Sequence, residues 1–188
     1  MKLLNKIFLI SFITLGTIYL LLPSPDNFPD LPGAVRSTEP GDTVQIENVS
    51  AYYTDMPRKE AVDFYFNYFS RSPFLNIPLI TYKLNHPPER IREVLRDTQQ
   101  STYVEEIVHP FRESFFVNGF EWNNDPFTPA KSREQNIFVV DGKTYQFKVT
   151  IFYQKSVVWI RLIIFYLATV LGCLLVKEFG KFIKRLRN

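Results

Sequence analysis

The chain is poor in the residues that build catalytic and metal centres. Its 188 residues include one cysteine, two histidines and seven glycines. The single cysteine, Cys173, excludes a disulfide within the chain and any metal site made of several cysteines. The glycines are scattered, so the sequence contains no glycine-rich loop for phosphates or dinucleotides. No Gly-x-Ser-x-Gly motif marks a hydrolase nucleophile.

Positive charge is scarce in the middle of the chain. Between Pro23 and Ser156 there are 14 lysines and arginines against 18 aspartates and glutamates, a net charge of −4, although the whole chain carries +3. A nucleic-acid-binding domain concentrates its basic residues on the folded part. We therefore expect no nucleic-acid partner, and the basic ends of the chain need another explanation.

The C-terminal apolar run, residues 157–176, predicts a transmembrane helix. Twenty residues suffice to cross about 30 Å of hydrocarbon, and the run lacks the polar stripe of a soluble core helix. Residues 177–188 form a basic tail, expected on the cytoplasmic side. Aromatic and basic side chains favour the headgroup region. The expected membrane-interface anchors are Lys6, Trp159, Arg161, Lys177, Lys181, Lys184 and Arg185.

The N-terminal apolar run allows two interpretations. Lys2 and Lys6 precede or begin an apolar stretch that extends to Leu22. A cleaved signal peptide starts in this way but ends in small residues at its cleavage site. Here the run ends in LLLPSPDNFP. We therefore favour an uncleaved transmembrane anchor over residues 1–22, with cleavage as the alternative.

The charges at both ends predict the orientation. Basic residues in short flanking segments stay on the cytoplasmic side of a membrane. Lys2 and Lys6 assign the N-terminus to that side, and the basic residues after Val176 assign the C-terminus to it. We expect an integral protein of the cytoplasmic (plasma) membrane with both termini inside and the central domain outside.

The expected fold is an extracytoplasmic α+β domain over residues 43–156, in the order β-α-β-α-α-β-β-β, between the two helices. Five prolines over residues 23–40 predict an extended linker over 23–42, either a spacer or a segment pinned to the domain surface. A strand is expected from Thr43 and another over 79–84. The helix between them has an apolar stripe, namely Ala61, Phe64, Tyr65, Tyr68 and Phe69.

Two further helices and a hairpin complete the expected domain. Residues 87–98 predict a short helix begun by two prolines. Val104, Ile107, Val108, Phe111 and Phe115 follow helical spacing, with a kink expected at Pro110. Asp141-Gly142 predicts a type I′ turn in a C-terminal β-hairpin, followed by a strand of about ten residues.

Glu105, His109 and Glu113 are the strongest candidates for chemistry. At spacings of four they share one face of the expected helix, where an imidazole and carboxylates could bind a divalent metal. Eight positions at 1.5 Å each span about 12 Å, too far for all three to reach one ion. Glu105 and His109 are therefore weak metal candidates on a solvated face, and no catalytic residue or cofactor is expected.

These observations favour a non-catalytic scaffold or accessory subunit of an envelope protein complex. Its expected partners are the lipid bilayer and another membrane or envelope protein. Trp122 and Phe127, in a turn-rich segment, are the expected partner contacts, because aromatic residues dominate such interfaces. One alternative is a small-ligand sensor with a pocket lined by Tyr65, Tyr68 and Phe69. A membrane-anchored hydrolase using His109 is the less favoured alternative.

Overall fold

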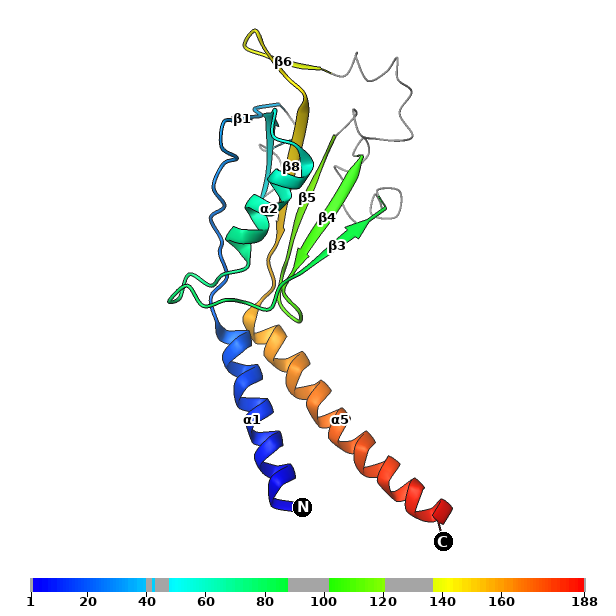
Figure 1. The fold of residues 1–188 in the computed structure, drawn as a ribbon. Coiled ribbons are helices and arrows are strands. Elements are labelled where there is room, and N and C mark those ends of the chain that lie inside the picture. Colours follow the sequence, from blue (N-terminus) through cyan, green and yellow to red (C-terminus); the bar gives the residue numbers. More distant parts are fainter. Residues whose placement is uncertain (1, 40–41, 43–47, 88–101, 121–136, 188) are drawn as a thin grey trace. The chain divides into compact units, whose positions relative to one another are not determined.

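The computed structural model describes residues 2–39, 42, 48–87, 102–120 and 137–187. The chain divides into two units (Figure 1). One unit contains the terminal segments Met1–Leu22 and Ser156–Asn188, and the other is a domain over Pro23–Lys155. The two units are described separately.

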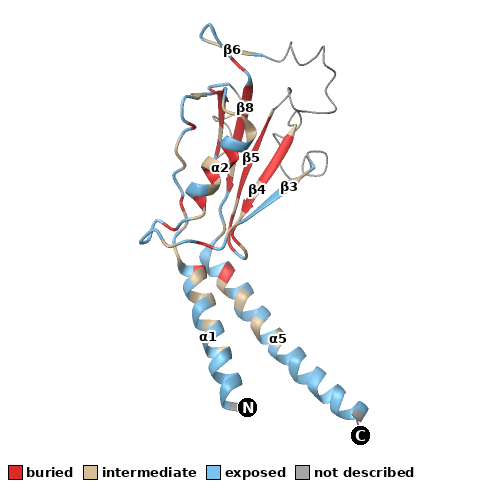
Figure 2. Ribbon diagram, in the orientation of Figure 1, coloured by how far each residue is buried: buried red, intermediate tan, exposed pale blue. Residues whose placement is uncertain are grey.

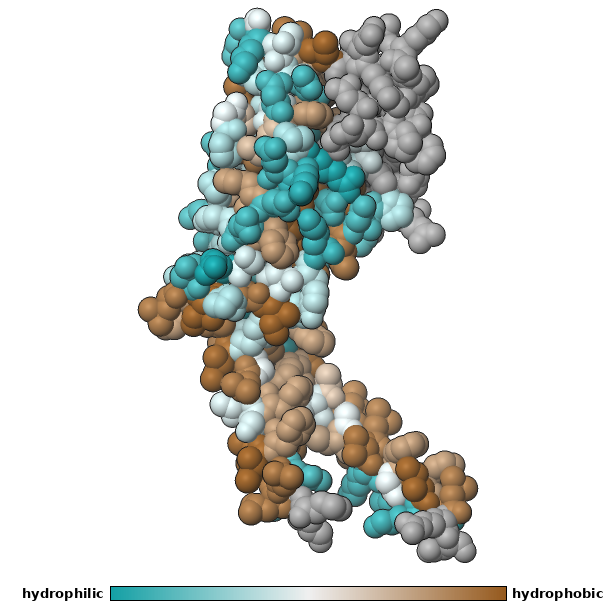
Figure 3. All heavy atoms as spheres, viewed as in Figure 1, coloured by the Kyte–Doolittle hydropathy of each residue, from teal (hydrophilic) through white to brown (hydrophobic). Residues whose placement is uncertain are grey.

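The terminal unit consists of helices α1 (Lys2–Leu21) and α5 (Val158–Arg187). Segments of 19 and 29 residues within them are long and apolar enough to cross a membrane, and their outer atoms are mostly apolar (Figure 3). The described helix α5 continues through the basic residues that follow the apolar run. The two apolar helices expected from the sequence are therefore present.

Helices α1 and α5 contact each other through small and polar residues. A Cβ atom at Gly16 would lie 2.4 Å from Cζ of Phe165, so a larger residue at position 16 would require the Phe165 ring to move. At the next residue of each helix, the hydroxyls of Thr17 and Tyr166 are hydrogen-bonded at 2.8 Å. Small residues and interhelical hydrogen bonds are the usual basis of helix pairing in lipid.

In the described part of the domain, one helix packs on one face of an antiparallel sheet. The six strands are ordered β1-β2-β8-β5-β4-β3, and a second, two-stranded sheet pairs β6 with β7. The helix is α2 (Arg58–Phe69). The strands are β1 (Val35–Arg36), β2 (Val49–Thr54), β3 (Tyr82–His86), β4 (Tyr103–Val108), β5 (Ser114–Phe120), β6 (Phe138–Val140), β7 (Lys143–Tyr145) and β8 (Phe147–Gln154).

The core lies between α2 and the central strands (Figure 2). The apolar stripe of α2 buries Ala61, Tyr65 and Phe69 completely. Phe115 of β5 faces this stripe, with its ring centroid 5.1 Å from that of Tyr65. The sequence-based helix and its core-facing stripe are thus confirmed for these residues.

The proline-rich segment lies along the domain. Phe28 stacks on Phe115 with ring centroids 4.2 Å apart, and Leu31 is buried in the same core. The Tyr52 hydroxyl donates a hydrogen bond of 2.8 Å to Asp30. Of the two arrangements considered for this segment, the described residues 23–39 adopt the pinned one.

The helix expected over Val104–Phe115 is wrong. These residues form the β-hairpin β4–β5, with Pro110 and Phe111 in the turn. Both faces of the hairpin are apolar: Ile107 packs in the core under α2, whereas Val104 packs with Phe116 on the opposite face. A strand buried on both faces loses its period of two, and the remaining pattern matches helical spacing by coincidence.

Other expected elements differ in extent. β2 coincides with the second half of the strand expected from Thr43, whose residues 43–47 lie outside the described residues, and β3 begins three residues after position 79. The expected helix over 87–98 falls almost entirely outside the described residues. The Asp141-Gly142 turn is confirmed, with φ values of 50° and 76° between β6 and β7.

The long strand expected after that turn is divided at Gln146. Its first part, β7, pairs with β6, whereas β8 crosses to the main sheet between β2 and β5. The Gln146 amide donates a hydrogen bond of 3.1 Å to Asp55, which lies just before α2. The alternation of side chains continues across the break, so the sequence carries no sign of the change of partner strand.

Candidate functional site

The turn between β4 and β5 contains a cluster of buried polar side chains, here called the junction cluster: Ser24, His109, Arg112 and Glu113. The side chains of His109, Arg112 and Glu113 have no exposed surface. Two backbone hydrogen bonds close the turn, from Arg112 N to His109 O at 2.9 Å and from His109 N to Glu113 O at 3.0 Å. The cluster therefore lies on a tightly defined backbone.

The Glu113 carboxylate is at the centre of the junction cluster. Its Oε1 accepts a hydrogen bond of 3.1 Å from Nε of Arg112 and lies 3.0 Å from Nδ1 of His109. Ser24 donates its hydroxyl proton to the same oxygen and accepts a hydrogen bond from the Arg112 guanidinium. A buried carboxylate and a buried guanidinium thus compensate each other's charge and share one serine.

His109 also connects the cluster to the helix. Its ring stacks on Phe69 of α2, with centroids 3.9 Å apart and planes 7° from parallel. Nε2 of His109 is buried and has no hydrogen-bond partner among the residues that the structure describes. Because the imidazole is sealed between the turn and α2, it packs the domain and is not presented to a substrate.

The structure separates the three residues once expected on one helical face. His109 and Glu113 meet in the turn, but Glu105 lies in β4 and binds Arg58 of α2, whose Nε is 3.1 Å away. That guanidinium also lies 4.6 Å from the centroid of the Tyr103 ring. Among the described residues, no group of three or more metal-ligating side chains converges. Glu105 and His109 therefore do not form a shared metal site. The solvated face expected for these two residues is wrong, because both are buried.

The junction cluster also marks the place where the chain enters and leaves the domain. Ser24 lies three positions after Leu21, the last residue of α1, and the hydroxyl of Ser72 bonds to the carbonyl of Pro23 at 2.7 Å. At the other side of the cluster, Ser114 pairs with Gln154, the last residue of β8. Both chain connections thus meet at one end of the sheet, beside the β4–β5 turn (Figure 1).

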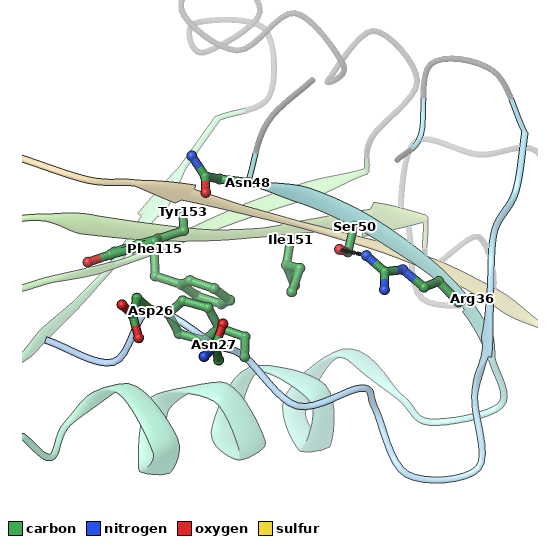
Figure 4. Close-up of a pocket in the computed structure, with 9 residues that line it drawn as sticks. Asp26, Asn27, Arg36, Asn48, Ser50, Phe115, Ile151 and Tyr153 are labelled. Carbon is green, nitrogen blue, oxygen red and sulfur yellow. Dashed lines mark hydrogen bonds between the residues drawn. The ribbon is translucent and has the colours of Figure 1, made fainter. Parts of the chain in front are cut away.

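A small pocket lies between the proline-rich segment and the sheet (Figure 4). Its volume is about 250 Å³. Aromatic and aliphatic side chains line one part of it, and polar and charged side chains line the rest. Arg36 reaches across from β1 and donates a hydrogen bond of 2.8 Å to the Ser50 hydroxyl. The lining residues are Asp26, Asn27, Phe28, Arg36, Asn48, Ser50, Phe115, Ile151 and Tyr153.

The charges in this pocket come from Asp26 and Arg36. Tyr52, on β2 near the pocket, remains neutral, because burial raises the pKa of its phenol and its hydrogen bond to Asp30 raises that pKa further. One acidic and one basic group beside apolar rings can accommodate a small molecule that carries both charges.

The structure places only some of the binding residues that the sequence suggested. Trp122 and Phe127 lie outside the described residues. Tyr65 and Phe69 are fully buried core residues, so no pocket opens at their stripe, and Tyr68 uses its hydroxyl to bond Asn27 O at 2.7 Å. The filled core at Tyr65 and Phe69 counts against the ligand pocket that the sensor alternative placed at that stripe.

The expected interface anchors belong to the helical unit. Arg161 donates hydrogen bonds to Ser156 at the start of α5, through Nε to the hydroxyl at 2.6 Å and through its terminal nitrogen to the carbonyl at 2.9 Å. Trp159 is exposed. Lys181 forms an exposed ion pair with Glu178.

Sequence reasoning missed Ser24, Phe28 and Arg36 as site residues. The one signal for the junction cluster is the charged pair inside the apolar stretch HPFRESFF, where a solvated face was the simplest interpretation. Comparison of the chain with protein families, curated proteins and solved structures found no match. Functional conclusions for this chain therefore come from its own residues.

We predict that Glu113→Gln destabilises the domain by about 3–5 kcal/mol, because it leaves the buried Arg112 guanidinium without a counter-charge. The matched control is Asp63→Asn, which removes a carboxylate from a half-exposed ion pair with Lys83. That change should cost about 0–1 kcal/mol. Urea unfolding of the full chain in mild detergent measures both, and equal losses would contradict the structural role of the cluster.

Proposed function

We propose that this chain is a two-span membrane protein with both termini on the cytoplasmic side and its α+β domain on the opposite side. There the domain acts as a non-catalytic scaffold or accessory subunit of an envelope protein complex. The observation that carries the proposal is the convergence of both chain connections on the β4–β5 turn.

The connections support a hairpin of two spans. Pro23 is bonded to Ser72, and Ser24 is bonded to Glu113, only two and three residues after α1 ends at Leu21. On the other side, three residues separate β8 from α5. An extended chain advances about 3.3–3.6 Å per residue, so neither connection can reach the far end of the domain. A chain that enters and leaves at one end, through two spans, returns to the side from which it started.

The charge distribution supports the same topology. Lys2 and Lys6 flank the start of the first apolar run, and five lysines and arginines follow Val176. Short segments with this excess of basic residues are retained in the cytoplasm. The central domain is far longer than the short segments to which this retention applies, so its own basic residues do not oppose translocation.

The rigidity of the domain supports a scaffold. The junction cluster fastens the incoming chain to the sheet, and the outgoing chain comes from β8, which is paired on both sides. Fixed connections hold a domain at a defined height and orientation. That property suits presentation of a surface to another envelope protein, for which Trp122 and Phe127 remain our proposed contacts.

We predict that the domain is accessible from outside and the tail is not. In a Cys173→Ser background, Asp63→Cys should react with a membrane-impermeant maleimide in intact bacterial spheroplasts. Lys184→Cys should react only after the membrane is permeabilised. Labelling of Lys184→Cys in intact spheroplasts, with protection of Asp63→Cys, would refute the proposed orientation.

We predict that the chain co-purifies with a membrane or envelope protein in near-stoichiometric amount from native membranes in mild detergent. Trp122→Ala combined with Phe127→Ala should release this partner, because loss of an aromatic anchor typically costs 2 kcal/mol or more, about 30-fold in affinity. Trp159→Ala, in α5, is the matched control and should retain it. A reproducible absence of any partner would remove the scaffold proposal.

The pocket supports a second candidate function, a small-ligand sensor. Asp26 and Arg36 carry opposite charges, and Phe28, Phe115 and Tyr153 provide an apolar surface between the strands and the proline-rich segment. The ligand class that suits this lining is a small zwitterion with an apolar part, such as an amino acid.

We predict for this alternative that at least one of the twenty amino acids raises the unfolding temperature of the full chain. A ligand at ten times its dissociation constant stabilises a protein by about 1.4 kcal/mol. Arg36→Gln should abolish the shift, whereas Arg71→Gln, at an exposed arginine outside the pocket, should preserve it. The absence of a shift with every amino acid would remove this candidate ligand class.

A further inference from the structure

In two turns of the domain, residues with left-handed backbone conformation carry large, exposed apolar side chains. In the first turn, Ile77 N bonds to Phe74 O at 3.3 Å, and the two central residues, Leu75 and Asn76, have φ values of 53° and 55°. In the second, the β4–β5 turn, Phe111 has a φ of 61°. Leu75 is 78% exposed and Phe111 is 73% exposed.

Leucine and phenylalanine are unusual choices for these positions. Left-handed backbone is strained for any residue with a Cβ atom, and glycine or asparagine normally occupies it. Here the side chains of the strained residues are exposed, so burial of their apolar surface does not offset the cost of the backbone strain. The turns require left-handed backbone, but asparagine or glycine would adopt it with less strain. Leucine and phenylalanine at these strained positions therefore point to a function for their side chains.

Both turns border the place where the chain enters the domain. Ser72, at the base of the first turn, donates its hydroxyl proton to the Pro23 carbonyl. Arg112, next to Phe111, donates to the Ser24 hydroxyl. Pro23 and Ser24 lie two and three positions beyond the end of α1. Both turns are therefore hydrogen-bonded, through a neighbouring residue, to the segment that directly follows an apolar helix.

The chemistry of the two turns suits a lipid surface. Residues 71–81 read RSPFLNIPLIT, and the turn residues 109–112 read HPFR, so neither segment contains a carboxylate. Phe74, half exposed, adds to the apolar surface beside Leu75, and apolar atoms gather on this loop in Figure 3. Arg71 is exposed beside the first turn, whereas Arg112 of the second turn is buried against Glu113. Exposed apolar side chains, accompanied in the first turn by an exposed arginine, are typical of segments that enter the boundary between headgroups and acyl chains.

We infer that Phe74, Leu75 and Phe111 insert into the headgroup–acyl boundary of the bilayer that the two apolar helices cross. This inference rests on the proposed two-span topology and extends it. The insertion adds a third and a fourth membrane contact to the two spans. The domain is then held against the bilayer surface and cannot tilt about its connections.

The test uses the full chain in lipid nanodiscs, where both membrane faces are open to solution. An environment-sensitive fluorophore is attached to Leu75→Cys, Phe111→Cys or the control Asp63→Cys, each in a Cys173→Ser background. Lipids with a nitroxide near the headgroup should quench the labels at 75 and 111 at least twofold more than the label at 63. The native Cys173, labelled in the unaltered chain, reports on the span and should be quenched by nitroxides deep in the acyl chains.

The outcomes separate the inference from the proposed topology. If Cys173 is quenched but positions 75 and 111 match position 63, the insertion is wrong and the two-span topology stands. If Cys173 is not quenched, the topology is wrong and the insertion is overturned with it. Labels at 75 and 111 that resist aqueous quenchers without quenching by lipid nitroxides would indicate a covering protein and also overturn the insertion.

A second set of variants guards against disturbance of the turns by the label. Leu75→Asn combined with Phe111→Asn places a residue that tolerates left-handed backbone at both positions, so the unfolding temperature in detergent should stay constant or rise. A label at Asn76→Cys should be quenched by headgroup nitroxides in the otherwise native turns. The double asparagine variant should lower that quenching at least twofold, and unchanged quenching would overturn the inference.

Discussion

The buried contact among Glu113, Arg112 and Ser24 is the constraint on which the remaining arrangement depends. It joins the hairpin β4–β5, which is apolar on both faces, to the segment that enters the domain. Two opposite charges in a sealed environment are stable only as a pair, because each alone would lose its hydration without compensation. The contact therefore specifies where residues 23–24 lie, and with them the direction of the whole proline-rich segment.

From that point the segment follows the sheet through specific contacts. Phe28 stacks on Phe115, Leu31 enters the core, and β1 pairs with β2. The same segment forms one wall of the pocket that holds Asp26 and Arg36. The junction cluster, the core and the pocket are thus linked by one extended stretch of chain, and their proposed roles in anchoring and binding share a physical basis.

Several features were readable from local sequence. The stripe of α2, the Asp141-Gly142 turn and the two apolar helices each depend on residues close together in the chain. The hairpin β4–β5 was misread because Val104 and Ile107 are buried on opposite faces, which erases strand alternation. The pairing of β8 with β2 and β5 joins residues about a hundred and about thirty-five positions apart, and local periodicity carries no information about such partners.

The sequence by itself determined the two apolar segments, the basic ends, the amphipathic helix and the tight turn, because length, charge and periodicity act within a few neighbouring residues. Only the tertiary structure decided that Glu113 and Arg112 are buried, that Ser24 lies between them, and that the ring of His109 is sealed against Phe69. These side chains are charged or polar, and their burial depends on partners far along the chain. Whether a charge is solvated or compensated in the interior is a property of the assembled fold.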